Sequence, residues 1–173
     1  MIYEALNRFL KHIPPYCDVI VVLHSALWDV LRYQEHFKRN QDEDAWIAEY
    51  QHNLTSYLEG LQTILERHYG SSSRRIMRSV VVKTTPLVDN RDIARPLHKL
   101  NQLKRGMAHE YKIFDAALDF KKVENVDAAY LKDHLHQNRE GSLRMFQSFL
   151  KYIKEHRLIS RNSHCKGPEV KGR

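Results

Sequence analysis

One short stretch of the sequence holds an acid and an imidazole at a spacing that suits hydrolytic chemistry. Asp133 and His136 lie three residues apart, just before an amphipathic segment that begins near Gly141. An imidazole titrates near neutral pH and can take a proton from a hydroxyl group, and a carboxylate can fix its tautomer and orientation. The pair therefore predicts two members of a Ser-His-Asp triad. The simpler interpretation is that Asp133 caps a turn and His136 is a surface side chain.

The third member of such a triad, an activated nucleophile, is not evident in the 173 residues. Ser25 follows a predicted strand, where α/β hydrolases place their serine, but no Gly-x-Ser-x-Gly turn surrounds it. We therefore expect Ser25 and Asp29 to bind backbone groups of their loop, with Ser25 as nucleophile the alternative. His134 and His136 have a spacing that can chelate, but no further cluster completes a tetrahedral set. We expect no metal and no other cofactor.

The segments that must position these residues alternate between helical and strand patterns. Apolar residues at helical spacing predict helices over 2–13, 42–69, 93–111 and 141–156, and continuous apolar runs predict strands over 18–24, 79–83 and 112–119. Such strands are typical of parallel sheets that are covered on both faces, so the alternation favours an α/β layered fold. In the last helix we expect five side chains to face the core: Leu143, Phe146, Phe149, Leu150 and Ile153.

Polar segments follow each of the three predicted strands. They are residues 24–29, residues 84–86 with Thr85, and the segment that contains Asp133 and His136. In open α/β sheets, ligands bind beyond the carboxyl ends of the strands. The sequence therefore predicts that these side chains converge on one edge of the sheet.

Length and charge exclude several classes of protein. The chain is long enough for one domain with its own core, and no run approaches the roughly 20 apolar residues of a membrane span. The net charge is +7, but residues 157–173 hold five basic residues against one acid, or +4, which leaves +3 elsewhere. We expect a domain over 1–156 and a solvated basic tail over 157–173, and no nucleic-acid partner. Cys17 borders an apolar run and is expected to be a buried thiol.

Two blocks of the sequence carry a family resemblance. Asp133-x-x-His136, followed by Asn138 and Glu140-Gly141, resembles the last conserved block of SGNH (GDSL-type) hydrolases. The segment over 18–33 is similar to the strand and loop of the PC-esterase-domain branch of that superfamily. Residues 50–54 and 80–86 also fit that branch, and the resemblance covers roughly residues 1–156.

The resemblance implies a three-layer fold and an esterase that acts on a small acyl ester. In such an enzyme a serine attacks the ester carbonyl, His136 takes its proton and Asp133 orients His136. The resemblance also implies a substrate or oxyanion loop formed by four residues: Ser25, Trp28, Asp29 and Thr85.

The sequence departs from the family pattern in two places. It contains no Gly-Asp-Ser motif, and Trp28 occupies the register of the oxyanion asparagine, where its indole N–H can donate one hydrogen bond. We therefore expect a hydrolase-like domain that is inactive as it stands; the alternative is a non-catalytic SGNH-like interaction protein.

The same resemblance predicts an incomplete sheet. The chain matches the family from the helix before its third-block strand onward, so about three strands are expected, with the N-terminal strands missing. Residues 19–23 would then form an uncovered apolar edge, and such an edge pairs readily with another chain. We expect self-association or a partner strand at this edge.

Overall fold

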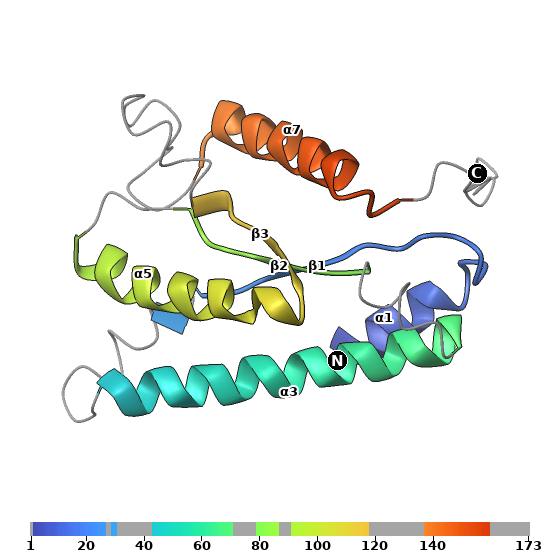
Figure 1. Cartoon of the computed structure of the whole chain (residues 1–173), viewed down its shortest axis with the longest axis horizontal. Coiled ribbons are helices and arrows are strands. Elements are labelled where there is room, and N and C mark those ends of the chain that lie inside the picture. Colours follow the sequence, from blue (N-terminus) through green and yellow to red (C-terminus); the bar gives the residue numbers. More distant parts are fainter. Residues whose placement is uncertain are drawn as a thin grey trace, which may run out of the picture.

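The computed structural model describes residues 2–26, 29–30, 43–70, 79–86, 91–117 and 137–159. Within these ranges the chain is a mixed α/β fold in which helices cover both faces of a small parallel sheet (Figure 1). Its elements in chain order are α1 (Ile2–Leu10), β1 (Val21–His24), α3 (Glu43–Tyr69), β2 (Val80–Lys83), α5 (Arg91–Gly106), the 3-10 turn η1 (Met107–His109), β3 (Lys112–Phe114) and α7 (Arg139–Glu155). The predicted alternation of helices and strands is confirmed.

The sheet has the order β1-β2-β3, and both strand pairs are parallel. In the register, His24 lies beside Lys83, and Lys83 lies beside Phe114. The central strand β2 is covered on both faces, because Val80, Val81 and Val82 are all buried. Its unbroken β-branched run therefore correctly predicts a strand in the interior of a parallel sheet.

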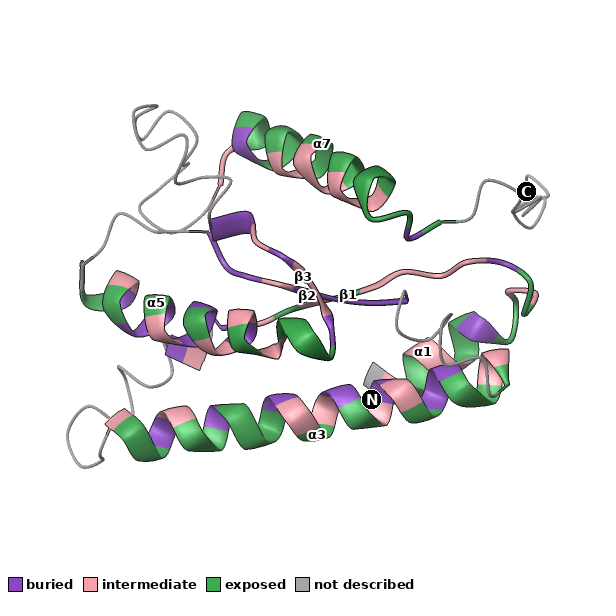
Figure 2. Ribbon diagram, in the orientation of Figure 1, coloured by how far each residue is buried: buried purple, intermediate pink, exposed green. Residues whose placement is uncertain are grey.

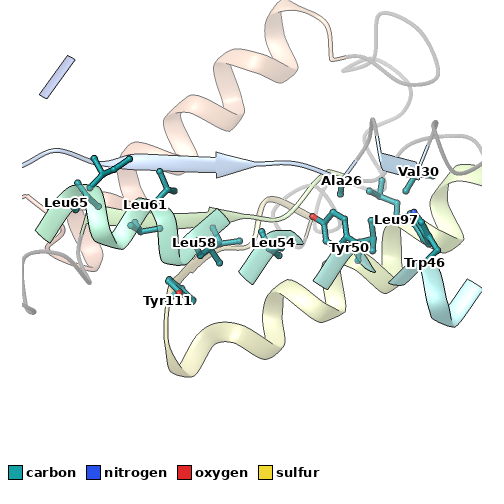
Figure 3. Close-up of a cluster of buried hydrophobic side chains, with 14 of the residues drawn as sticks. Ala26, Val30, Trp46, Tyr50, Leu54, Leu58, Leu61, Leu65, Leu97 and Tyr111 are labelled. Atoms are coloured by element: carbon teal, nitrogen blue, oxygen red, sulfur yellow. The ribbon is translucent and has the colours of Figure 1, made fainter. Parts of the chain in front are cut away.

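One face of the sheet packs against α1, α3 and α5 (Figure 1). Seven side chains of α3 are buried at helical spacing, and Figure 3 shows most of them between the helix and the sheet: Trp46, Tyr50, Leu54, Leu58, Leu61, Ile64 and Leu65. Two acidic residues in the first turn, Glu43 and Asp44, suit the positive end of the helix dipole. Gly70, with a φ of +67°, follows its last residue in the left-handed conformation that commonly ends helices.

The other face of the sheet packs against α7. Phe149 and Ile153 face this second cluster as expected, but Met145 and Tyr152 join them. The expectation that the other three apolar residues of α7 face the core is wrong, because Leu143, Phe146 and Leu150 are all about half exposed or more. Figure 2 shows that much of α7 is exposed. Beyond α7, Leu158 is buried in the same cluster.

The edge strand β1 is fixed at its start by the last residue of α3. The Tyr69 hydroxyl donates to the carbonyl of Cys17 at 3.0 Å and accepts from the amide of Val19 at 2.8 Å. Cys17 is buried as expected, but it is disulfide-bonded, so the prediction of a thiol is wrong. Among the described residues β1 has β2 on one side and no strand on the other, and Val22 is 39% exposed.

Within the same ranges, none of the helices combines the length and hydropathy needed to cross a membrane.

Candidate functional site

The carboxyl ends of the three strands meet at one edge of the sheet. We call this the carboxyl edge and define it as residues 24–26, 83–86 and 114–117. Parallel pairing places these segments side by side, and in open α/β sheets this is where ligands bind. Three polar side chains of α5 also reach it: Asn101, Lys104 and Arg105.

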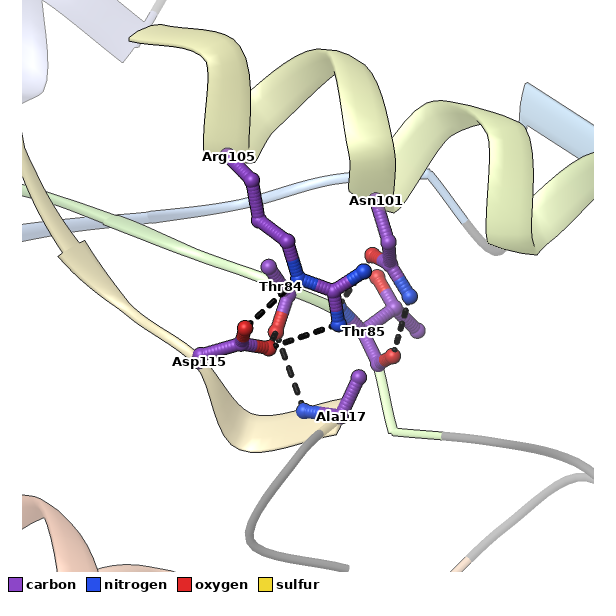
Figure 4. Close-up of polar contacts among 6 residues, drawn as sticks. All are labelled: Thr84, Thr85, Asn101, Arg105, Asp115 and Ala117. Carbon is purple, nitrogen blue, oxygen red and sulfur yellow. Dashed lines mark hydrogen bonds and ion pairs between the residues drawn. The ribbon is translucent and has the colours of Figure 1, made fainter. Parts of the chain in front are cut away.

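Thr85 joins the end of β2 to the end of β1. Its hydroxyl donates to the carbonyl of Ser25 at 2.9 Å. Its backbone is held by the buried side chain of Asn101, which accepts from the Thr85 amide at 2.8 Å and donates to the Thr85 carbonyl at 2.8 Å (Figure 4). Two of the predicted loop residues, Ser25 and Thr85, are therefore in direct contact.

Thr84 joins the end of β2 to the end of β3 on the other side. Its hydroxyl donates to Asp115 at 2.8 Å and accepts from the amide of Ala117 at 3.0 Å (Figure 4). Arg105 of α5 completes the group with two hydrogen bonds to the Asp115 carboxylate, at 2.6 and 3.0 Å. A bidentate pair of this kind fixes geometry as well as charge. The turn after β3 is thus tied to both β2 and α5.

The hydroxyl of Ser25 is engaged by a buried tyrosine of α3. Ser25 Oγ and the Tyr50 hydroxyl are 2.7 Å apart. Burial raises the pKa of Tyr50, the hydrogen bond with Ser25 opposes that change, and the charge of Asp29 adds to it. A phenol with a raised pKa stays protonated at neutral pH, so it is a poor general base for a serine. The contact positions the Ser25 hydroxyl without activating it.

The turn after Ser25 is closed by Asp29. The Asp29 carboxylate accepts a hydrogen bond from the amide of Ala26 at 3.0 Å, as expected of a residue that binds backbone groups of its loop. Ala26 has a φ of +118°, a conformation that favours glycine. The sequence gives no sign of this turn, because alanine is not a turn former.

Lys104 is a residue of the candidate site that the sequence analysis did not predict. It is fully buried, and its ammonium group donates to the carbonyls of Ser25 and Lys83, the latter at 3.1 Å. Burial lowers its pKa to about 7, while the charge of Asp29 raises the pKa and that of Lys83 lowers it further. A signal was available, because position 104 continues the buried stripe of Leu97 and Leu100 at helical spacing.

The predicted site residues fall into two groups. Ser25, Asp29 and Thr85 lie together at or beside the carboxyl edge. Trp28, Asp133 and His136 lie outside the described residues. In the part of the chain that the structure describes, no three His, Cys, Asp or Glu side chains are grouped so that they could hold a metal ion.

Comparison with protein-family models finds no match, and comparisons with curated proteins and with solved structures find none either. The site is therefore interpreted from its own chemistry. It offers the Thr85 hydroxyl, the Asp29 carboxylate and the buried Lys104 amine at the end of a parallel sheet, each bound to backbone groups of the carboxyl edge.

Proposed function

We propose that this chain is an SGNH-like domain of the PC-esterase type, which binds a small acyl ester at the carboxyl edge of its sheet and turns it over only weakly. The observation that carries the proposal is the contact between Thr85 and Ser25. It brings together two residues that the resemblance assigns to the substrate loop and that lie 60 positions apart in the sequence.

The chemistry of the site supports binding more than turnover. In the proposed mechanism Asp133 orients His136, and His136 acts as general base toward a water molecule. The Ser25 hydroxyl is hydrogen-bonded to Tyr50, which does not activate it. Neither the sequence nor the described site offers an activated serine elsewhere. In well-studied hydrolases, removal of a triad member leaves about 10³–10⁴-fold acceleration over water, against 10⁶-fold or more for typical complete enzymes.

Hydrolysis of p-nitrophenyl acetate by the full chain tests this function. We expect the wild type to accelerate hydrolysis by no more than about 10⁴-fold, and His136→Ala to lower the rate at least about tenfold, because the general base is lost. Ser25→Ala should lower the rate far less than His136→Ala, because alanine keeps the backbone carbonyl that binds Thr85. His52→Ala, at an exposed position of α3, is the matched control for loss of an imidazole. Equal rates for the wild type and His136→Ala would refute the catalytic role of His136, and a large loss in Ser25→Ala would make Ser25 the nucleophile.

An interaction protein is the second candidate function, and two exposed apolar features favour it. One is the open side of β1 with the half-exposed Val22; the other is the stripe of Leu143, Phe146 and Leu150 on α7. Soluble monomers rarely leave large contiguous apolar areas uncovered. In this second proposal the chain uses the edge strand to bind a partner strand or a second copy.

Light scattering of the full chain tests the edge-strand proposal. We expect the apparent mass to rise with protein concentration, and Val22→Lys to shift this rise to higher concentration, because a lysine on an edge strand opposes pairing. Gln51→Lys adds the same charge at an exposed position of α3 and should associate like the wild type. A wild type that stays monomeric at every concentration contradicts the proposal.

A further inference from the structure

A row of three side chains crosses the sheet at its carboxyl edge. The register pairs His24 with Lys83 and Lys83 with Phe114. Side chains two residues apart on a strand share a face, and Val81 and Phe114 both belong to the cluster that packs against α7. Lys83 and His24 therefore lie on the α7 side of the sheet, on the opposite face from the buried stripe of α5.

Lys83 is a half-buried cation for which the described part of the chain provides no counter-charge. No hydrogen bond or ion pair of its ammonium group occurs with any described residue, whereas Lys99 and Lys151 each pair with a glutamate. Burial lowers the pKa of Lys83 to about 8, and no carboxylate acts to raise it. Partial burial of an unpaired ammonium is costly, so folded proteins normally give such a group an anionic partner.

The surroundings of Lys83 make the potential at this position more positive. Partial burial and the charges of Lys83 and Lys104 lower the pKa of the neighbouring His24. Enough of His24 is accessible that the residue still counts as exposed. Lys104 contributes its charge from the α5 side of the sheet. The charge of Asp29 raises the pKa of Lys104, whereas no described carboxylate raises the pKa of Lys83.

We propose that Lys83 and His24 form a binding site for an anionic group, a carboxylate or a phosphate, on the α7 side of the carboxyl edge. The Lys83 ammonium pairs with the charge, and the exposed imidazole of His24, one strand away in direct register, donates a hydrogen bond. Where the ester-binding function proposed above holds, this site implies an ester that carries a negative charge; that implication rests on the proposed function, whereas the anion site itself does not.

Titration of the full chain in inorganic phosphate and, separately, in acetate tests the site at constant ionic strength. The readout is the NMR signal of each lysine, followed over pH to give its pKa. Phosphate or acetate should raise the pKa of Lys83 by at least about one unit, because a bound anion favours the charged amine. Chloride at the same ionic strength controls for screening. A response to phosphate, to acetate or to both supports the site and names the anion, and a response to neither overturns it.

Matched variants locate the site. Lys83→Met should weaken anion binding at least about tenfold, since charge-assisted hydrogen bonds carry the affinity. Lys11→Met removes the same charge beyond the end of α1 and should bind like the wild type. Where Lys83→Met does not fold, Lys83→Arg keeps the charge and should bind, and the wild-type pKa measurement decides the question without any variant. Equal binding by folded Lys83→Met and the wild type overturns the assignment.

The anion titration involves no ester, so its result is independent of catalysis. A chain that binds phosphate but does not hydrolyse p-nitrophenyl acetate keeps the anion site and loses the esterase proposal. A chain that hydrolyses the ester but binds neither anion keeps the esterase proposal and loses this site.

Discussion

Replacement of Lys104 by methionine should remove the larger part of the rise in stability between pH 7 and pH 10, and Lys83, whose pKa burial lowers to about 8, should keep a smaller rise. The folded-state pKa of Lys104 is lowered from its ordinary 10.5 to about 7 by burial, so across this interval the unfolded chain binds a proton that the folded chain does not. The free energy of unfolding then rises with pH by about 1.4 kcal/mol per unit, and by up to about 5 kcal/mol in total. The destabilisation of the folded state by the buried, protonated Lys104 is fully present below pH 7 and is absent above pH 10.5.

Urea unfolding at several pH values measures this effect. The quantity compared between the wild type and Lys104→Met is the slope of the free energy of unfolding against pH. Lys99→Met is the matched control, because Lys99 lies on the same helix but is partly exposed and pairs with Glu43 at 2.6 Å. The control should keep the slope of the wild type. If Lys104→Met also keeps it, then Lys104 titrates in the folded protein as it does in the unfolded chain, and the buried-amine description of the site is wrong.

Replacement of Asn101 by leucine should lower the free energy of unfolding by about 2–5 kcal/mol, because two buried backbone groups of Thr85 lose their partners. Leucine has as many side-chain heavy atoms as asparagine and the same branching at Cγ, but it can neither accept from the Thr85 amide nor donate to its carbonyl. Leaving a buried polar group unpaired costs about 1–3 kcal/mol, which is more than the hydrogen bond itself contributes to stability.

The midpoint of urea unfolding measures this loss, and an unchanged denaturant dependence shows that the folded state is still compact. Gln102→Leu, at the exposed neighbouring position of α5, makes a comparable substitution without touching Thr85 and should change stability by less than about 0.5 kcal/mol. A loss below about 1 kcal/mol in Asn101→Leu would mean that other groups or water satisfy the Thr85 backbone.

The layered α/β fold could be predicted because each helix and each strand has its own apolar pattern within a short stretch of sequence. The β-branched run over Val80–Lys83 and the buried stripe of α3 each fit one periodicity, so strand and helix could be assigned without knowledge of the partners. The orientation of α7 could not be predicted in the same way. Its apolar residues span about half of the helix circumference at 100° per residue, and only the packing decides which part of that arc meets the sheet.

The candidate site was predictable only in part, because its geometry depends on contacts that are distant in sequence. A parallel sheet places the segments after its strands at one edge, so the residues after β1 and β2 were predicted to converge, and Thr85 does contact Ser25. Nothing in the sequence pairs Ser25 with Tyr50. Lys104 was overlooked because a charged residue in an apolar stripe is usually taken to extend into solvent, whereas here two backbone carbonyls bind its ammonium group.

Two tyrosines of α3 bind the segment that contains β1, and their separation along the helix matches the separation of their partners along the strand. Tyr69 binds the backbone at Cys17 and Val19, and Tyr50 meets Ser25 at the other end. The two tyrosines are 19 positions apart, about 28 Å along a helix, and Ser25 lies eight positions after Cys17, about 26 Å in extended conformation. A slip of β1 by a single residue would move it about 3.3 Å and break both anchors. The two contacts therefore fix the register of β1 relative to α3, so the side of β1 that has no neighbouring strand among the described residues keeps its backbone groups at fixed positions.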